Sequence, residues 1–556
     1  MNSKTLVLLA SAWCALVIPT TASADNVVII NAKIFTGSGV HPQARAVVVT
    51  GDRISFVGST TAARARSQPN ARIIDAGGRL LTPGLIEAHT HLGPESPGQQ
   101  VSMPALMWPG PSAAQAIQAV RAAAASGTGW ISGTIGPATL SGERDWRSEL
   151  DAVAGGRPVR LRAWWGHGTL LNSAALRQLG ISDRAPDPIG GWYGRRADGT
   201  LNGLVREQAE VLVAMQLTKR APLSAGVTAF REAAAQYAKW GVTTIHQMAH
   251  NYRVGEITAT LHAAQPSLRW SVYGWASPER QPRDAWAEFA SPPLMPASAR
   301  LAGIKWILDS TPIERDAFQR TPYADRPGQR GRSNYSDAEL RQILEGGLRG
   351  SQQLALHVVG DAEVQRLFTA MEKIAPAARW RAKRVRIEHG DGITADLLPA
   401  AKRLGVVVVQ NPLHILPDKD ETGRPWLENR LGEERARRFL LFRSLLRAGV
   451  PLSLGSDAGG EAANPFLNMM FAVRYDRNPV EALTREQALA AYTAGGAFAE
   501  GQEHQKGRIA VGAKADLALL SQDVLTVPLD RLPATVSLLT VVDGVVVHEG
   551  AAGLQR

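Results

Sequence analysis

The sequence predicts an α/β protein built around an eight-stranded, TIM-type (β/α)8 barrel. Eight short apolar runs alternate with helix-like stretches through the middle of the 556-residue chain, and about 150 residues separate the first run from the second. Short strands with tight turns occupy both ends of the chain. Eight strand–helix units predict a closed parallel barrel. The two ends predict a small composite β-sandwich domain, and the long gap predicts an insert between barrel strands 1 and 2.

The apolar runs are mostly continuous, which is typical of strands buried on both faces of a parallel sheet. They span residues 80–88, 242–247, 270–275, 302–308, 354–358, 385–388, 406–410 and 451–455. Helix-like stretches such as 337–348, 361–374 and 433–448 separate them. In a barrel of this kind the active site lies at the carboxyl ends of the strands.

Both ends of the chain have the pattern of short strands broken by turns. Examples are residues 27–30, 46–49 and 54–58 near the start, and 516–520 and 540–547 near the end. We therefore expect residues 25–82 and 503–556 to form one composite β-sandwich domain. Residues 83–502 would form the barrel, with the insert at about 95–235.

The first 24 residues are typical of a secretory signal peptide. Lys4 supplies a positive charge, residues 5–18 are apolar but too short to span a bilayer comfortably, and Ala24 ends a small-residue cleavage site. A buried helix or a membrane anchor is the alternative. We expect cleavage after Ala24, a periplasmic or secreted protein, and no stable membrane anchor afterwards. Cys14, the one cysteine, would be removed, so that no disulfide forms.

The net charge of +11 does not predict nucleic-acid binding. Lys and Arg are scattered along the chain, and the densest run, residues 433–438, mixes both signs as a solvated helix face does. Glycine-rich fragments such as Gly459-Gly460 lack a phosphate-loop pattern, which argues against a nucleotide cofactor.

The sharpest chemical signal is a His-x-His motif at the end of the first apolar run. His89 and His91 stand two residues apart in a strand, so both imidazoles point to the same side. Two neutral imidazoles side by side suit a zinc-like ion. A surface pair is the alternative, but the end of a barrel strand favours a site.

Other strands end in the same types of residue. His357 ends the fifth strand, His389 the sixth, and Asp457 follows the eighth. A single histidine there is more often a hydrogen-bonded core residue, but four histidines and an aspartate at one rim favour a metal site. The ligand types fit zinc or another divalent metal.

Lys305 stands in the fourth strand among apolar neighbours. Burial lowers the pKa of a lysine and favours its neutral amine, which can react with CO₂ to form a carbamate that bridges two cations. From the sequence, a salt bridge to Asp309 or to another acid is an equal alternative.

Together these residues resemble the binuclear site of the amidohydrolase superfamily. Six stretches make the chain similar to the family 3 branch that includes N-substituted formamide deformylases: GHG at 166–168, LNSAAL at 171–176, DGTLNGLVRE at 198–207, HVVGDA at 357–362, AYTA at 491–494 and KGRIAVGAKADL at 506–517. The resemblance covers nearly all of the mature chain.

The resemblance implies roles for the individual ligands. One metal would be bound by His89, His91 and Asp457, and a second by His357 and His389. Carboxylated Lys305 (N6-carboxylysine) would bridge the two ions.

Three residues depart from the family pattern. Glu87 replaces an Asp, Ser310 a Gly and Gly459 a common Pro. All three flank ligands, so they bear on substrate shape more than on metal binding.

The implied activity is a metal-dependent hydrolase of carbon–nitrogen bonds other than peptide bonds, acting on a small amide or N-acyl compound. Water activated by metal would attack the carbonyl, with Asp457 as general base. A deaminase or cyclic-amide hydrolase on the same scaffold is the enzymatic alternative, and a non-catalytic periplasmic binding protein is the other. The sequence leaves the oligomeric state open, a homo-oligomer included.

Further polar and aromatic residues are weaker candidates for substrate contacts. His167 and Asn172 in the insert, and His246 at the end of the second strand, are predicted substrate contacts, although His167 equally suits a turn cap. His250 and His414 lie in predicted barrel-top loops. An aromatic-lined mouth, or else core packing of the insert, would account for Trp108, Trp130, Trp164 and Trp165.

Overall fold

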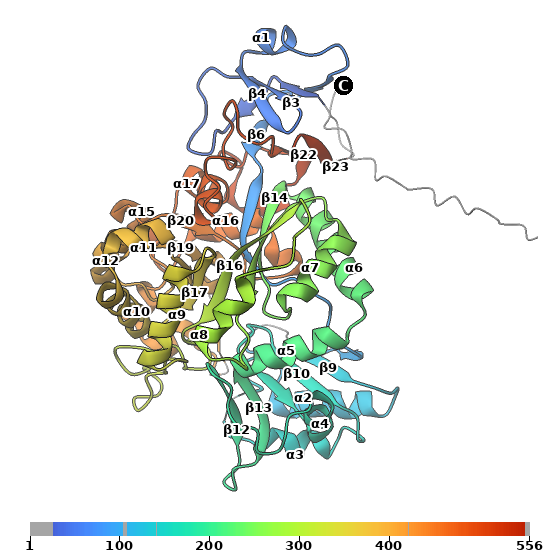
Figure 1. Cartoon of the computed structure of the whole chain (residues 1–556), viewed down its shortest axis with the longest axis vertical. Coiled ribbons are helices and arrows are strands. Elements are labelled where there is room, and N and C mark those ends of the chain that lie inside the picture. The colour runs from blue at the N-terminus through green and yellow to red at the C-terminus, as the bar shows by residue number, and fades with distance from the viewer. Residues whose placement is uncertain (1–25, 104–107, 141, 417, 421, 551–556) are drawn as a thin grey trace, which may run out of the picture.

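The computed structural model describes residues 26–103, 108–140, 142–416, 418–420 and 422–550. Three parts follow one another along its long axis (Figure 1): two small sheets at one end, the barrel in the middle and the insert at the other end. The expected signal peptide lies outside the described residues.

The middle part is an eight-stranded, nearly closed barrel, as predicted. Its sheet order is β20-β19-β18-β17-β16-β15-β14-β7, and every paired neighbour is parallel. The strands are β7 (Leu85–Thr90), β14 (Val242–Met248), β15 (Arg269–Trp275), β16 (Ala299–Ile307), β17 (Gln353–Val358), β18 (Arg386–His389), β19 (Val407–Gln410) and β20 (Leu452–Leu454). Asp457 N donates to His89 O at 2.9 Å, which links the ends of β20 and β7.

The first predicted apolar run proves to be two strands. Residues 80–83 form β6 (Leu80–Pro83), which belongs to a terminal sheet, and β7 begins after Gly84. A Cβ atom on Gly84 would lie 2.1 Å from Thr243 Oγ1. The chain therefore passes close to β14 at this point, and only glycine allows that approach.

Both ends of the chain contribute to the terminal sheets, which confirms the composite β-sandwich. One sheet has the order β4-β3-β1-β5, and the other has β2-β6-β21-β22-β23. Their strands are β1 (Val27–Ile30), β2 (Lys33–Ile34), β3 (Ala46–Thr50), β4 (Arg53–Gly58), β5 (Arg72–Asp75), β21 (Leu517–Leu520), β22 (Ser537–Val542) and β23 (Val545–Glu549). A shared core that includes Ile29, Val47, Leu81 and Leu519 lies between them.

The insert is a separate layer at the carboxyl-terminal end of the barrel, in the lower part of Figure 1. Its sheet has the order β12-β13-β11-β10-β9-β8. The strands and helices are β8 (Gln99–Val101), α2 (Ala113–Ala124), β9 (Ile131–Ile135), α3 (Trp146–Asp151), β10 (Val159–Ala163), β11 (Thr169–Leu171), α4 (Ser173–Leu179), β12 (Gly191–Arg195), β13 (Leu201–Glu207) and α5 (Gln208–Arg220).

Of the remaining helices, α1 (Thr60–Arg64) belongs to the terminal domain, and the others lie in the segments that connect or follow the barrel strands. They are α6 (Leu223–Lys239), α7 (Val254–Ala264), α8 (Pro282–Ala285), α9 (Asp337–Arg349), α10 (Asp361–Ile374), α11 (Ala377–Lys383), α12 (Leu398–Leu404), α13 (Trp426–Leu431), α14 (Glu433–Arg437), α15 (Phe442–Ala448), α16 (Pro465–Arg474), α17 (Arg485–Ala491) and α18 (Ala494–Ala499). The predicted helix over 433–448 is two helices, because the backbone turns at Leu440, whose φ is +60°.

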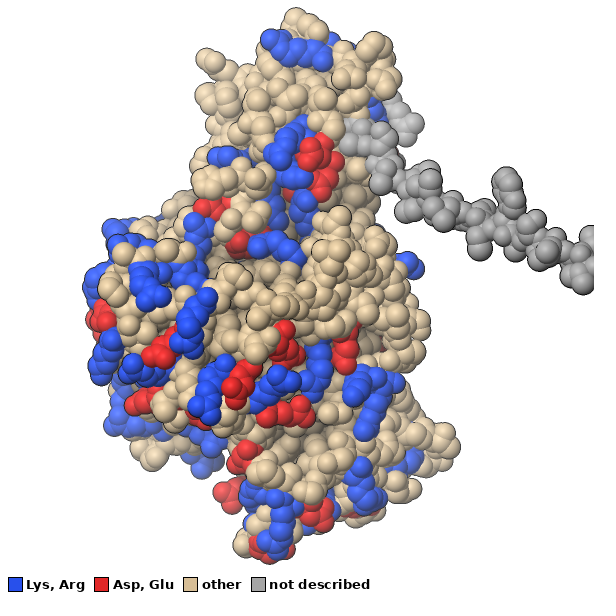
Figure 2. Space-filling model, viewed as in Figure 1, with Lys and Arg blue, Asp and Glu red and all other residues tan. Residues whose placement is uncertain are grey.

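Lys, Arg, Asp and Glu side chains are scattered over the face shown in Figure 2. Of the helices in the described part of the chain, none has the length and apolar character needed to cross a bilayer.

Candidate metal centre

Six ligand-type side chains meet at the carboxyl-terminal end of the barrel. The strands bring together His89 and His91 from β7 and its end, Lys305 from β16, His357 from β17, His389 from β18 and Asp457 from the segment after β20. All of them except the fully buried His89 line one cavity of about 390 Å³. The structure thus gathers every residue predicted as a ligand, while metal binding itself stays a prediction.

The spacing within this group fits a metal ion. His89, His389 and Asp457 each offer a ligand atom, and these atoms lie within 4.8 Å of one another. His91 Nε2 lies 3.3 Å from both His89 Nε2 and Asp457 Oδ1. Ligands at about 2.0–2.2 Å from one zinc ion are themselves roughly 3–4 Å apart. Nitrogen and carboxylate donors at this spacing suit a zinc-type ion.

Three of the imidazoles are fixed from behind through Nδ1. The partners are Glu388 Oε2 at 2.5 Å for His89, the Met248 carbonyl at 3.0 Å for His91 and Asn411 Oδ1 at 2.9 Å for His389. Occupation of Nδ1 leaves Nε2 of each ring for another ligand, and such partners orient the rings of metal-binding histidines.

Glu388 is the strongest of these partners. Burial raises the pKa of its carboxyl, but Arg386, Lys305 and His89 outweigh burial and hold that pKa well below its usual range. Arg386 is fully buried and pairs directly with Glu388. The His89 ring therefore faces a permanent carboxylate.

His357 and Lys305 are held differently. His357 Nε2 is buried and has no hydrogen-bond partner among the described residues. Lys305 is 1% exposed, and burial lowers the pKa of its amine to about 8. Its Nζ lies 5.8 Å from the centre of the Trp275 ring. Leaving a buried polar atom without a partner costs free energy, so this side of the group is compatible with a bound metal ion.

The predicted alternative for Lys305, a salt bridge to Asp309, is absent from the described structure. The Asp309 carboxylate instead accepts hydrogen bonds from the backbone N–H groups of Val359, Gly360 and Phe318 at 2.8–3.0 Å. It therefore fixes the loop after β17 and leaves the lysine amine free of that ion pair.

The backbone is strained at two predicted ligands. His389 has a φ of +70° and Asp457 a φ of +52°, and neither is glycine. Such conformations cost free energy and cluster where a side chain must be aimed. Gly455 allows the close approach beside them, because a Cβ atom there would lie 2.5 Å from His89 N.

Glu87, which departs from the family pattern, is buried behind the site. Its Oε1 accepts hydrogen bonds from the backbone N–H groups of His89 at 3.0 Å and Ser456 at 2.8 Å. Burial raises the pKa of this carboxyl to about 8. Glu87 thus connects the end of β7 to the segment that carries Asp457.

Ser310, the second departure, connects the barrel to the insert. Its hydroxyl donates to Glu207 Oε1 at 2.6 Å, and Glu207 also accepts from His167 Nδ1 at 3.0 Å. The His167 ring lies 5.0 Å from the His357 ring, and His167 lines the cavity. This position is compatible with the predicted substrate contact. Gly459, the third departure, also lines the cavity.

His414 and His250 also line the cavity. His414 Nδ1 lies 2.7 Å from Asp391, and its Nε2 lies 3.7 Å from Asp457. Burial disfavours the charged ring, but Asp391 and Asp457 outweigh burial and raise the pKa of His414 to about 10. A positive charge therefore faces Asp457 from the loop after β19.

Two predicted substrate contacts lie away from the cavity. His246 is fully buried in the barrel, with Nδ1 2.8 Å from Arg386 Nη1 and Nε2 3.2 Å from Glu500 Oε1. Asn172 is 1% exposed, and its side chain caps α4 and bonds the backbone of Val159. Polar groups of the protein already occupy both side chains, and substrate contact by either residue stays a prediction.

Aromatic side chains line the cavity, but they are not the same set of tryptophans that the sequence suggested. Trp108, Trp164 and Trp165 line the cavity, as do Trp275 and Trp426, which the sequence did not single out. The ring of Trp108 stacks on that of Trp426 at 5.0 Å. Trp130 packs in the insert instead.

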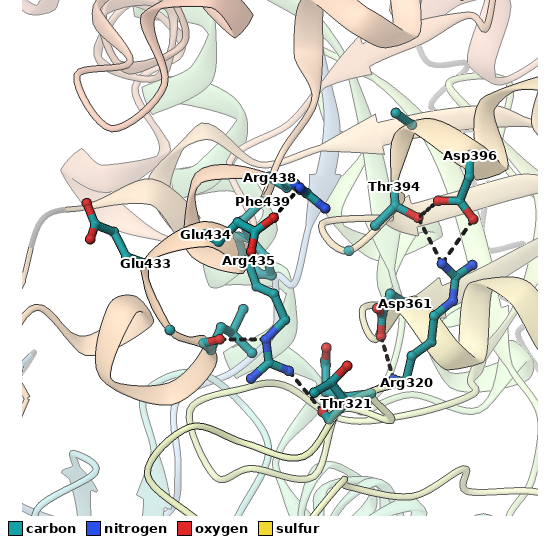
Figure 3. A pocket seen from close by; sticks show the side chains of 15 residues that line it. Arg320, Thr321, Asp361, Thr394, Asp396, Glu433, Glu434, Arg435, Arg438 and Phe439 are labelled. Carbon is teal, nitrogen blue, oxygen red and sulfur yellow. Dashed lines mark hydrogen bonds and ion pairs between the residues drawn. The ribbon is translucent and has the colours of Figure 1, made fainter.

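A larger hollow of about 970 Å³ lies elsewhere, among Arg320, Asp361, Arg435 and Phe439 (Figure 3). Its charged groups are already paired, since Arg320 meets Asp396 at 3.0 Å and Arg435 donates to backbone carbonyls. It contains none of the histidines, so we do not assign the chemistry to it.

The residues that hold the histidine rings through Nδ1 were not predicted from the sequence. Glu388 and Arg386 were detectable in principle, because charged residues inside an otherwise apolar barrel strand require partners. Glu207 and Asn411 gave no comparable signal, because only the fold brings them to histidines that are distant in the chain.

Known proteins resemble this chain over most of its length. The sequence profile described as "Amidohydrolase family" matches residues 72–548. An N-substituted formamide deformylase of Arthrobacter pascens is 26% identical, covering 94% of this chain and 98% of that protein. The putative amidohydrolase YtcJ of Bacillus subtilis (strain 168) is also 26% identical, and the match covers 86% of this chain and 91% of YtcJ.

A solved structure has the same fold. An uncharacterized metal-dependent hydrolase from Pyrococcus horikoshii OT3 superposes with a TM-score of 0.68 at 21% identity, covering 91% of this chain and 99% of its own.

Proposed function

The chain belongs to the amidohydrolase family and is a metal-dependent hydrolase, and we propose that the bond it cleaves is a carbon–nitrogen bond of the amide or N-acyl type. One observation supports this proposal above the others. Imidazoles oriented from behind surround a carboxylate at the floor of a cavity large enough for a small molecule.

The proposed ligands divide between two divalent ions, zinc being the best fit to their chemistry. His89, His91 and Asp457 would hold one ion, His357 and His389 the other, and carboxylated Lys305 both. Support for the carbamate comes from the buried amine, whose lowered pKa favours the neutral form that reacts with CO₂. When bound, such ions lower the pKa of a water and polarise a carbonyl group.

The residues of the chain would then move the proton. Asp457 lies against the imidazoles, so its carboxylate accepts the proton of the attacking water. It next delivers this proton to the leaving nitrogen, so that one water is consumed and an acid and an amine form. His167, fixed by Glu207, is placed to orient the bound amide.

The export of this enzyme is a separate proposal. The expected signal peptide implies a periplasmic or secreted hydrolase of small molecules, with no nucleic-acid partner and no lasting membrane anchor. Fractionation of cells that express the full chain, together with N-terminal sequencing of the mature protein, tests export and cleavage after Ala24.

A metal-loaded screen tests the function. The purified chain is loaded with zinc, its metal content is measured, and release of amine is followed for N-formyl, N-acyl and cyclic amides. We expect about two ions per chain and turnover of open-chain amides. Turnover confined to esters, or to cyclic amides, would contradict the proposed bond type.

Carbamate formation has its own test. The Lys305→Met variant keeps an apolar side chain of similar length but cannot take up CO₂. We expect this variant to bind one ion in place of two, and wild-type chain prepared without bicarbonate to load the second ion slowly. An unchanged metal content in both samples would reject the bridging role.

A further inference from the structure

A second cavity adjoins the proposed metal centre. It has a volume of about 600 Å³ and lies between the loop after β7, strand β10 and the end of α5. His91, Arg162 and His250 line both this cavity and the one that contains the proposed ligands. These three side chains therefore form the boundary between the two spaces, and a molecule at the metal centre has the second cavity beside it.

Three arginines distinguish this second cavity. Arg160 and Arg162 come from β10, and Arg220 comes from the end of α5. Among the described residues that line the cavity, Glu95 is the acidic one, and its side chain is exposed. The walls are thus strongly positive.

The two arginines of β10 point into the same space. They stand two residues apart in a strand, so their side chains share one face. Arg162 Nε donates to Glu210 Oε1 at 3.0 Å, and Arg160 Nη1 donates to Ser96 Oγ at 2.8 Å. In the described part of the chain, no group accepts a hydrogen bond from Arg160 Nη2 or from either terminal nitrogen of Arg162.

Arg160 forms no ion pair with any residue that the structure describes. It is 6% exposed, and its Nε is buried with no partner among the described residues. Burial and the neighbouring charge of Arg162 lower the pKa of Arg160 to about 10, only partly offset by Glu210. Two adjacent cations with one paired carboxylate are an unfavourable arrangement unless an anion joins them.

We propose that this cavity binds a carboxylate of the substrate, which makes the substrate an N-acyl amino acid. The apolar acyl group would lie against Trp108 and Trp164 in the first cavity, with the scissile amide at the metal centre. Its carboxylate would reach Arg160 and Arg162, which offer the paired N–H donors that match a carboxylate. Water cleaves the amide, releasing a carboxylic acid and an amino acid. This inference rests on the proposed function and specifies its substrate class.

Two compounds that differ in one group test the proposal. N-benzoylglycine carries the carboxylate, whereas N-ethylbenzamide replaces it by a methyl group and keeps the same benzoyl amide. Binding of each to the zinc-loaded chain is measured by calorimetry, and release of benzoate is measured separately. We expect the wild-type chain to favour N-benzoylglycine by about tenfold or more in affinity and in KM.

Substitutions of the arginines then test whether these residues cause the preference for N-benzoylglycine. Arg160→Gln and Arg162→Gln should each weaken N-benzoylglycine by about tenfold and leave N-ethylbenzamide within about threefold. Arg160→Lys keeps the charge at the buried position, so it should fold and retain part of the preference. Arg177→Gln removes the same charge from an exposed position of α4 and should change neither compound.

The outcomes separate this inference from the proposed function. Equal use of both compounds by wild type and variants would overturn the carboxylate site and leave amide hydrolysis standing. Binding of N-benzoylglycine that depends on the arginines, without release of benzoate, would support the site and count against the hydrolase. If inorganic phosphate bound as tightly as N-benzoylglycine and depended on the same arginines, the cavity would be a general anion site and the substrate assignment would fail.

Discussion

The two sides of the proposed metal centre are held in different ways. On one side, His89, His91 and His389 each have Nδ1 engaged by a group of the protein. On the other, His357 Nε2 is buried without a partner among the described residues, and Lys305 is a buried amine with no ion pair there. The first side is organised by the fold alone. The second contains a buried ring nitrogen and a buried amine that the described residues leave without partners, which is compatible with the proposed second ion.

The largest effect is expected from a substitution of Asp457, the carboxylate that lies beside His89 and His91. Asp457→Asn keeps an oxygen donor beside His89 and His91 but removes the carboxylate that we propose as the base. We expect kcat to fall by about 10²–10⁴-fold with metal content unchanged, because proton transfer by a positioned side chain contributes that much. Steady-state kinetics and metal analysis on the same sample check this. Full turnover with metal retained would refute Asp457 as the base.

The next largest effect is expected when the charge of Glu388, the partner of His89 Nδ1, is removed. Glu388→Gln leaves a hydrogen bond but no negative charge behind the ring, and we expect zinc affinity to fall by about 10–100-fold. Competition with a chromogenic chelator measures the change. Glu345→Gln, which alters a carboxylate on the outer helix α9, serves as the control. Equal affinity in both variants would mean that the carboxylate does not support the ring.

A smaller effect is expected at Asn411, because the group that holds His389 Nδ1 is an uncharged amide. Asn411→Ala removes the amide oxygen that holds His389 Nδ1, and a neutral hydrogen bond contributes about 1 kcal/mol. We therefore expect zinc affinity to fall by roughly fivefold, less than in Glu388→Gln. The same chelator competition decides the order. A larger loss in Asn411→Ala would reverse the ranking of the two supports.

The smallest effect is expected at Glu87, one of the three residues that depart from the family pattern. Glu87→Asp restores the common residue but shortens the side chain that bonds the N–H groups of His89 and Ser456. We expect a loss of about 1 kcal/mol in the free energy of unfolding and kcat within about twofold of wild type. Urea denaturation and kinetics measure both. A large loss of kcat would assign Glu87 a direct part in catalysis.

The eight strands and the convergence of the six ligand-type residues could be predicted from the sequence, because continuous apolar runs and residues at strand ends are local signals. The hydrogen-bond partners that come from distant parts of the chain could not. Asn411 and Glu207 meet His389 and His167 only after the barrel and insert have folded.

Two predicted substrate contacts, His246 and Asn172, lie away from the cavity for the same reason. Strand position placed His246 near the rim, but its neighbours Arg386 and Glu500 occupy the ring within the barrel. Likewise, nothing local distinguishes Asn172, a helix cap, from a residue that faces substrate. The pattern of apolar residues predicts the strand or helix, whereas the role of a side chain depends on the groups that contact it in the folded protein.

The pairing of β6 with β21 has a consequence for the order of folding. Residues 81–83 lie beside residues 517–519 in one sheet, and Gly84 alone separates β6 from the first barrel strand. During synthesis on the ribosome, β6 has no neighbour on that side until nearly all of the chain has emerged. The sheet edge therefore stays open for most of translation, and the terminal domain closes as a late event of high contact order.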